Sequence, residues 1–401
     1  MIKHVLEEAT DIAEEIIAHR RWLHTHAEVG FNLQDTLAYV KSQLENMGYE
    51  VSCCGKSGLV TLAGKPGNGV ILLRADMDAL PIREETGLPY AANSGNMHAC
   101  GHDFHTAMLL GAAKLLKIHE NSLSGQVKLM FQSAEEIFEG AKDMIEHGVL
   151  ENPSVDAGIM IHVATNVPIP AGTALISPPG ISAPAADYFT IRVQGKGCHG
   201  SMPQNGIDAL TVSAHILLAL QEISARELGI ADRAIITVGN LHGGTASNVI
   251  ADSATMGGTV RCFDETLRET IKSRIKEISD GIAVTFRAKA EVTFESGTPT
   301  LLNDRCLCDF AETELTNLLG AQAIPISRLN ATPSAGGSED FAYVSHRIPT
   351  VMLSLAAGEA TKGYAYPLHH PQTVFDESAI SNGTAALTYL AIRYLEEYKR
   401  P

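Results

Sequence analysis

Three apolar runs in the first half of the chain most constrain its fold. Val70–Leu73, Val127–Phe131 and Ala157–Ile161 have the continuous apolar character of strands buried on both faces of a parallel sheet. Stretches of helical periodicity at 103–118 and 138–148 separate them. This alternation is typical of an α/β domain. Sites in open α/β sheets lie beyond the carboxyl ends of the strands, so we expect the residues that follow these runs to converge there.

Acidic and imidazole side chains follow each of these runs. The first is followed by Asp76 and Asp78, the second by Glu135 and Glu136, and the third directly by His162. The alternative for Glu135 and Glu136 is a solvated acidic pair at a helix start, where the helix dipole favours negative charge. The alternative for His162 is a core histidine with satisfied hydrogen bonds. Neighbouring carboxylates that diverge can instead divide the work, one binding metal and one accepting a proton from water, and we favour this interpretation.

The segment Met97–His105 adds a thiol, three imidazoles and a carboxylate directly before an apolar helical stretch. Borderline-soft divalent metals such as Zn²⁺, Mn²⁺ and Co²⁺ take these ligand types. We expect Cys100 and His102 to bind metal, because a thiol just before a helix N-terminus is a good thiolate candidate. The alternative for Cys100 is a small buried hydrophobe. His98 and His105 are expected to pack or to orient the ligands.

Composition and charge exclude several classes of protein. A chain of 401 residues with 45% hydrophobic and 19% charged residues is typical of a globular protein of two domains. Its net charge of −16 argues against nucleic acid or an anionic membrane surface as partner. Residues 1–19 are amphipathic and rich in Glu, and no apolar stretch reaches the length of a membrane span. Seven cysteines, an odd number, do not indicate a disulfide framework, so we expect a reduced, cytoplasmic protein.

The middle of the chain changes character after the Pro- and Ala-rich stretch Ser177–Ala186. The pattern predicts strands near 187–195, 233–240, 253–263 and 289–295, and helices near 208–227 and 264–280. The order β-α-β-β-α-β is that of a ferredoxin-like sandwich. We therefore expect an inserted α+β domain at 184–296, within a discontinuous α/β domain formed by 1–183 and 297–401.

Six motifs, spread over nearly the whole chain, carry a resemblance to a known family. They are Arg20–Glu28, Arg74–Pro81, Met97–His105, Glu135-Glu136, Gly243–Ile250 with Gly258–Arg261, and Ser338–Tyr343. The sequence resembles the amidohydrolase branch of the aminoacylase/carboxypeptidase metallopeptidase superfamily, which includes hippurate hydrolases and auxin-conjugate hydrolases. The resemblance implies a metal-dependent exopeptidase-like α/β catalytic domain, with the inserted ferredoxin-like domain acting as a lid and mediating dimerisation.

The resemblance also implies a dinuclear metal site and assigns its residues. Two divalent ions per subunit (Zn²⁺, Mn²⁺, Co²⁺ or Ni²⁺) would be held by Cys100, His102, Glu136, His162 and His369. Glu135 would be the general base for a metal-activated water, and Asp78 would support the ligands from behind. His370 remains the alternative to its neighbour His369.

Three residues of the inserted domain would complete the site. Asn248 and Arg261 match residues that hold the carboxylate of the substrate, a task that suits a guanidinium, and their alternative is an ordinary surface pair. His199 matches a lid histidine that reaches the active site of the other subunit of a homodimer and stabilises the oxyanion. We do not expect Cys198 to form a thiol–imidazole pair with His199, because adjacent strand residues point to opposite faces.

The expected activity is hydrolysis of the amide bond of N-acyl-amino acids or similar small amino-acid conjugates. The alternatives are a metal-dependent carboxypeptidase or dipeptidase, and a relative that binds metal or ligand without turnover. The intact Glu135 argues against the last of these. Departures from the family pattern occur at Ala27, Ser133, Ala164, Thr165 and Gln204, and none of them removes an expected ligand or the base.

Overall fold

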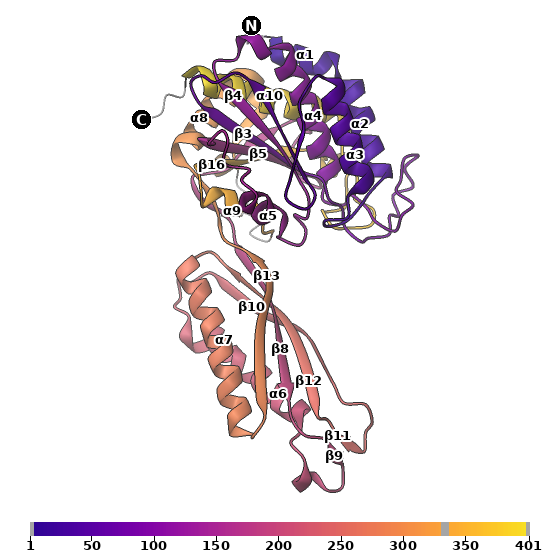
Figure 1. The fold of residues 1–401 in the computed structure, drawn as a ribbon, viewed down its shortest axis with the longest axis vertical. Coiled ribbons are helices and arrows are strands. Elements are labelled where there is room, and N and C mark those ends of the chain that lie inside the picture. The colour runs from indigo at the N-terminus through magenta and orange to yellow at the C-terminus, as the bar shows by residue number, and fades with distance from the viewer. Residues whose placement is uncertain (1–3, 330–336, 398–401) are drawn as a thin grey trace. The chain divides into compact units, whose positions relative to one another are not determined.

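The computed structural model describes residues 4–329 and 337–397, and the chain divides into two compact units (Figure 1). Unit 1 comprises Met1–Ser182, Leu302–Ser334 and Asp340–Pro401, and unit 2 comprises Ala183–Leu301 and Ala335–Glu339. The sequence placed the boundaries after residues 183 and 296, so unit 2 extends a few residues further at its C-terminal side. It also includes the short segment 337–339 from later in the chain, which the sequence did not indicate.

Unit 1 is built on an eight-stranded mixed sheet in the order β1-β2-β4-β3-β5-β16-β6-β15. Its strands are β1 (Ser52–Cys54), β2 (Gly58–Gly64), β3 (Val70–Asp76), β4 (Gln126–Gln132), β5 (Ala157–Ala164), β6 (Ala174–Ile176), β15 (Ala323–Pro325) and β16 (Thr350–Ala356). The central strands β4, β3, β5 and β16 run parallel. Every residue of β3 is buried, as the apolar run within it predicts. The predicted α/β class is confirmed.

The helices of unit 1 pack around this sheet. They are α1 (Val5–Asp11), α2 (Ala13–Thr25), α3 (Gln34–Asn46), α4 (His102–Ile118), α5 (Gly140–Glu146), α8 (Arg305–Leu319), α9 (Ala342–Ser345) and α10 (Ile380–Glu397). Helix α4 packs against α2, α10 and β3 and is buried along most of its length, so its first turn is held firmly at the sheet (Figure 1).

The end of β5 differs from the sequence-based prediction. The apolar run 157–161 was expected to stop at His162, but β5 continues to Ala164 because Val163 and Ala164 pair with Leu355 and Ala356 of β16. His162 therefore lies within a hydrogen-bonded strand, which fixes its position more firmly than a loop would.

Unit 2 is a four-stranded antiparallel sheet covered on one face by two helices (Figure 1). Its elements are β8 (Ala185–Gln194), α6 (Ala209–Glu222), β10 (Ala234–Gly243), β12 (Ser253–Cys262), α7 (Glu265–Thr285) and β13 (Lys289–Thr298). The sheet order is β10-β12-β8-β13, and the chain order is the predicted β-α-β-β-α-β. Two further small sheets, not expected from the sequence, pair β9 (Cys198–His199) with β11 (Val249–Ile250) and β7 (Gly180–Ala183) with β14 (Leu301–Asn303).

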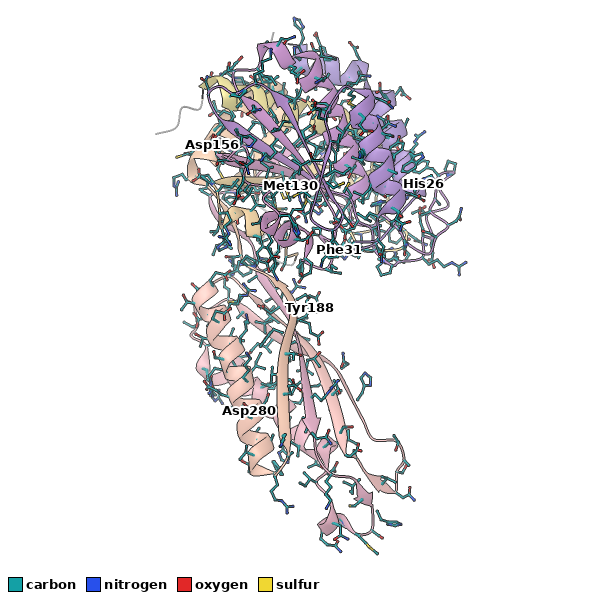
Figure 2. All side chains as sticks on the ribbon, in the orientation of Figure 1. His26, Phe31, Met130, Asp156, Tyr188 and Asp280 are labelled. Atoms are coloured by element: carbon teal, nitrogen blue, oxygen red, sulfur yellow. The ribbon has the colours of Figure 1, made fainter. Side chains whose placement is uncertain are left out.

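Each unit has its own apolar core. In unit 1, Met130 of β4 is fully buried, whereas in unit 2 Asp280 lies on the exposed face of α7 (Figure 2). Ile271 and Ile275 of α7 are buried in the core of unit 2. Among the described residues, no helix combines the length and the apolar character needed to cross a membrane.

Candidate metal centre

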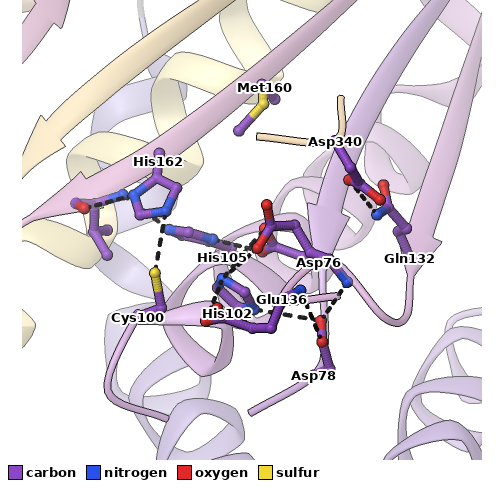
Figure 3. A network of polar contacts seen from close by, with 12 residues as sticks. Asp76, Asp78, Cys100, His102, His105, Gln132, Glu136, Met160, His162 and Asp340 are labelled. Atoms are coloured by element: carbon purple, nitrogen blue, oxygen red, sulfur yellow. Dashed lines mark hydrogen bonds and ion pairs between the residues drawn. The ribbon is translucent and has the colours of Figure 1, made fainter. Parts of the chain in front are cut away.

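Acidic, imidazole and thiol side chains gather where the central parallel strands of unit 1 end (Figure 3). They come from β3 and the turn after it (Asp76, Asp78), the turn before α4 and its first residue (Cys100, His102), the turn after β4 (Glu135, Glu136), β5 (His162) and the loop before α10 (His369). The convergence expected from the three apolar runs is therefore present in the structure.

The Cys100 thiol lies at the middle of this group. Its Sγ is 3.5 Å from Nε2 of His162 and 3.3 Å from Nε2 of His369. Two sets of possible ligand atoms share this sulfur, one with His102 and His162 and the other with Glu136 and His369. Within each set all ligand atoms lie within 4.8 Å of one another. Such an arrangement can hold two metal ions that share one thiolate ligand.

His162 has the protonation state that a metal ligand needs. Its Nδ1 lies 2.7 Å from the carbonyl oxygen of Val163, which can only accept, so Nδ1 carries the proton and Nε2 presents its lone pair to Cys100. Burial and the neighbouring His105 lower the pKa of His162 to about 3. The ring therefore stays neutral at ordinary pH.

His102 and Cys100 are both buried, and among the described residues the imidazole ring of His102 has unsatisfied nitrogens. Nδ1 and Nε2 of His102 lie 3.5 Å from Asp78 Oδ1 and Asp76 Oδ2, and within the described part of the chain neither nitrogen makes a hydrogen bond. Although burial alone would lower the pKa of His102, the surrounding carboxylates raise it. Burial, together with the carboxylate of Glu136, raises the pKa of the Cys100 thiol. A divalent cation fits these residues, because it would ligate an orphaned nitrogen and stabilise the thiolate.

Asp78 holds the main chain of the two glutamates. Its carboxylate oxygens accept hydrogen bonds from the N–H groups of Glu135 and Glu136, at 3.0 and 3.2 Å. The pair is flanked by Ala134 (φ 56°) and Phe138 (φ 57°), both in the left-handed region that non-glycine residues rarely adopt. Such local strain is frequent at functional sites.

The carboxylates of both glutamates face the same histidine. Oε2 of Glu135 lies 3.8 Å from Nε2 of His102, and Oε1 of Glu136 lies 3.9 Å from it. Oε1 of Glu136 is also 3.5 Å from Nε2 of His369. Glu136 thus faces two candidate ligands and Glu135 lies beside them, 5% exposed.

His105 is held by hydrogen bonds that exclude it as a ligand. Its Nδ1 lies 2.6 Å from Asp76 Oδ1, and its Nε2 accepts the N–H of Val163 at 2.8 Å. Both ring nitrogens are therefore occupied, although Asp76, His102 and His105 lie close enough to form a metal-binding group. His105 instead fixes the main chain beside His162, which agrees with the orienting role expected for it.

The fully buried Arg74 balances the charge of Asp76, an ion pair that the sequence did not predict. Arg74 Nη1 donates to Asp76 Oδ2 at 2.6 Å, and Nη2 donates to Asp340 Oδ1 at 3.1 Å. Asp340 also accepts from Gln132 Nε2 at 2.7 Å and from the N–H of Ala141 at 2.9 Å. Asp340 belongs to the Ser338–Tyr343 motif, but no local pattern in the sequence identifies its distant partners.

The geometry separates the adjacent histidines of the last ligand segment. His369 has φ 63°, donates its N–H to the carbonyl of Ala99, and directs its ring toward Cys100. His370 instead stacks on Tyr366 with ring centroids 4.4 Å apart. This arrangement favours His369 over His370 as the ligand.

In unit 2, His199 and Asn248 lie together and are exposed. The short strands β9 and β11 place them side by side, with Val249 paired to His199 and the N–H of Gly200 donating to the carbonyl of Asn248 at 2.7 Å. The Nδ1 atom of His199 accepts the N–H of Ser201 at 3.1 Å. The neutral ring therefore carries its proton on Nε2, where it can donate.

Arg261 lies instead in the four-stranded sheet of unit 2. It is near the C-terminal end of β12, where Nη1 donates to Ser338 Oγ at 2.6 Å and the guanidinium lies 5.9 Å from the ring of Tyr188. The β9–β11 ribbon adjoins the opposite end of β12, where Gly195 donates to Asp252. Eight residues of strand separate the two ends, roughly 25 Å. One copy of unit 2 therefore does not bring Arg261 together with Asn248 and His199.

A model of peptidase family M20/M25/M40 matches residues 72–393. The chain belongs to this family, and the resemblance to metal-dependent amidohydrolases is confirmed. It is 38% identical over 388 residues to the N-acetyl-L-cysteine deacetylase of Bacillus subtilis (strain 168), covering 96% of this chain and 89% of that protein. It is 36% identical over 396 residues to the IAA-amino acid hydrolase ILR1-like 2 of Arabidopsis thaliana, covering 96% and 87%.

The fold is shared with solved structures of the family. The crystal structure of the Bacillus subtilis YXEP protein, described as a dinuclear metal binding peptidase, superposes with a TM-score of 0.77 at 33% sequence identity. The superposition covers 96% of this chain and 99% of the YXEP chain.

The turn that carries Cys100 and His102 predicts a stability difference between two glycines. Gly101 and Gly95 both have φ 86°, but a Cβ on Gly101 would lie 2.4 Å from Cγ2 of Val163, whereas one on Gly95 would meet open space. Gly95→Ala should cost about 1–2 kcal/mol of unfolding free energy for the left-handed backbone alone. Gly101→Ala should cost about 1–3 kcal/mol more, for overpacking. Chemical denaturation of the two variants measures the difference, and equal losses would contradict the tight packing of this turn.

Proposed function

We propose that the protein is a metal-dependent amidohydrolase that cleaves the amide bond of N-acyl-amino acids or similar small amino-acid conjugates. The observation that carries the proposal is the pair of ligand sets that share the Cys100 sulfur, with the Glu135 carboxylate beside them. The proposed ligands of two divalent ions are Cys100, His102, Glu136, His162 and His369. The deacetylase and amino-acid conjugate hydrolase named among the relatives, and the dinuclear metal binding described for YXEP, support this assignment.

The proposed chemistry assigns proton transfer to Glu135. Divalent ions at these ligands (Zn²⁺, Mn²⁺, Co²⁺ or Ni²⁺) supply Lewis-acid activation of a water molecule and of the amide carbonyl. Glu135 accepts a proton from the attacking water as the new carbon–oxygen bond forms. It then delivers that proton to the amide nitrogen as the carbon–nitrogen bond breaks, giving a carboxylic acid and a free amine. Asp78 keeps Glu135 in place through the main chain.

Residues of unit 2 are proposed to bind the substrate. Arg261 and Asn248 hold its carboxylate, and His199 donates from Nε2 to the oxyanion. Because Arg261 lies near one end of β12 and the β9–β11 ribbon that carries the other two adjoins its opposite end, a site that uses all three requires unit 2 from two subunits. The protein therefore acts as a homodimer.

The surface of unit 2 supports association through this unit. Strand β10 is an edge strand, and edge strands with exposed apolar side chains readily pair with another chain. Ile235 of β10 is 64% exposed, and Leu218 of the neighbouring helix α6 is 68% exposed. A homodimer that covers both residues would remove this apolar surface from water.

We further propose that the protein works in the cytoplasm. All seven of its cysteines are free thiols, including the proposed ligand Cys100. A reducing compartment keeps such thiols available for metal binding.

Replacing the base tests the chemistry. Glu135→Gln keeps the shape of the side chain but cannot accept a proton, so hydrolysis of N-acetyl-amino acids should fall about 10²-fold or more. Bound metal, measured by elemental analysis, should stay near the wild-type amount. Glu146→Gln, on the exposed end of the next helix, is the matched control and should keep full activity. Unchanged turnover in metal-replete Glu135→Gln would remove Glu135 from the mechanism.

Mixing inactive variants tests the shared site. Glu135→Gln and His199→Ala should each be nearly inactive, but heterodimers formed from them contain one site with both native residues. Random reassortment makes half of the dimers mixed, so activity should recover to about a quarter of the wild-type value. Glu135→Gln mixed with Cys100→Ser is the control: both changes lie in unit 1, and no complete site forms. No recovery after verified subunit exchange would show that His199 does not act in its partner's site.

A further inference from the structure

A buried cluster of charges joins helix α2 to the start of α4. We name it the His24 clamp; it consists of Arg20, His24, Glu84 and Asp103. All four side chains are at most 1% exposed. His24 Nδ1 lies 2.8 Å from Asp103 Oδ2, and its Nε2 lies 3.2 Å from both carboxylate oxygens of Glu84. Arg20 Nε lies 2.8 Å from the same oxygen of Asp103.

His24 is positively charged in this setting. Ionised carboxylates only accept hydrogen bonds, so a ring that bonds to one on each nitrogen carries a proton on both. Burial alone would lower the pKa of His24, but its hydrogen bonds to Asp103 and Glu84 outweigh burial and raise the pKa. With Arg20, two cations thus face the carboxylates of Asp103 and Glu84, and Arg20 also pairs with Glu377 at 3.1 Å.

One end of the clamp lies in the segment that carries two proposed ligands. Asp103 directly follows His102 and is in the first turn of α4, where its Oδ1 accepts the N–H of Phe104 at 2.9 Å. Cys100 lies three residues before it, across the tight Gly101 turn. Any displacement of Asp103 therefore moves both side chains.

The other end of the clamp lies in a long strap, residues 80–97, which begins and ends at an antiparallel bridge between Leu80 and Met97. Glu84 fixes the strap internally by accepting the N–H of Ala92 at 2.7 Å. The next residue of the strap, Glu85, donates its N–H at 2.9 Å to the carbonyl of Pro371.

That contact brings the strap to the last proposed ligand. Pro371 lies two residues after His369, whose own N–H donates to the carbonyl of Ala99. The segments that carry Cys100 and His369 are therefore tied to each other directly and, through the strap, to His24.

We propose that His24 is a positioning residue for the metal centre: its imidazolium, bridging Asp103 and Glu84, fixes the Cys100 segment relative to the His369 segment. The inference rests on the proposed metal site and assigns a task to the Arg20–Glu28 motif that the proposed mechanism does not use. Residues behind metal ligands commonly set affinity in this way, and their loss typically costs 10- to 100-fold in metal affinity or activity.

The alternative is a cluster that only stabilises the fold. Removing one partner of a buried ion pair is destabilising, because a charge remains uncompensated, whereas replacing both partners with apolar residues is often neutral. The double variant His24→Leu/Glu84→Leu uses this difference, since Asp103 keeps Arg20 as its partner. A purely stabilising role predicts full recovery in the double variant, and a positioning role does not.

The experiment uses the full-length protein loaded with Co²⁺ alone, without substrate. The readouts are the free energy of unfolding, the Co²⁺ dissociation constant and the thiolate-to-cobalt charge-transfer absorption, which reports the Cys100–metal geometry. His24→Gln and His24→Leu/Glu84→Leu should both weaken Co²⁺ binding 10- to 100-fold and alter the absorption band. The double variant should nevertheless be more stable than His24→Gln, apart from the loss of the hydrogen bonds that Glu84 accepts from Ala92 and Thr86. His19→Gln, buried on the same helix but bonded to Tyr39, is the matched control and should leave the band unchanged.

Recovery of both Co²⁺ affinity and the absorption band in the double variant would overturn the inference. Should these variants not fold, Glu84→Gln tests the contact between His24 and Glu84 instead. This change removes the negative charge of residue 84 but keeps the shape of the side chain and one accepting oxygen. An unaltered affinity and band in folded Glu84→Gln would equally count against the clamp. Absence of the charge-transfer band in the wild-type protein would instead contradict the proposed metal site, so the two failures are distinguishable.

Discussion

The free-energy cost of burying charged and polar groups without partners determines which residues surround the metal centre. Asp76 and His102 have no exposed surface, and Cys100 has little. All three lie at the end of a sheet whose strands are apolar. Such groups are expensive to bury unless an opposite charge or a hydrogen bond compensates them. Arg74 compensates Asp76, and main-chain N–H groups compensate Asp78. The thiol and the ring of His102 face one another and further carboxylates, and a bound cation is the partner that fits them.

Local patterns in the sequence predicted that the residues after the apolar runs meet, whereas His369 was expected only from the family resemblance. Neither indicated which contacts hold these residues in place. Glu135 and His162 follow apolar runs, and the convergence of such strand ends is a property of parallel sheets. The support of the site comes instead from contacts between distant segments: Arg74 reaches Asp340 across 266 residues, and His24 reaches Glu84 across 60. No periodicity marks such pairs, because they depend on how segments far apart in the chain pack against one another.

Unit 2 shows a second limit of reasoning from sequence. Arg261 and His199 were expected to serve one site, but only Arg261 lies on an element of the predicted β-α-β-β-α-β order. Their separation follows from the register of β12 and from the β9–β11 ribbon, which are long-range features. If both residues act on one substrate, the dimer is part of the active site, and dilution or interface mutations reduce turnover as well as assembly.

Anomalous X-ray scattering from crystals grown with Zn²⁺ can locate the metal ions at the proposed dinuclear site. We expect two zinc peaks per chain, both within about 2.3 Å of the Cys100 sulfur, the usual zinc–thiolate distance. One should also contact His102 and His162, and the other Glu136 and His369. A single peak, or two peaks neither of which contacts Cys100, would contradict the dinuclear site that the geometry supports.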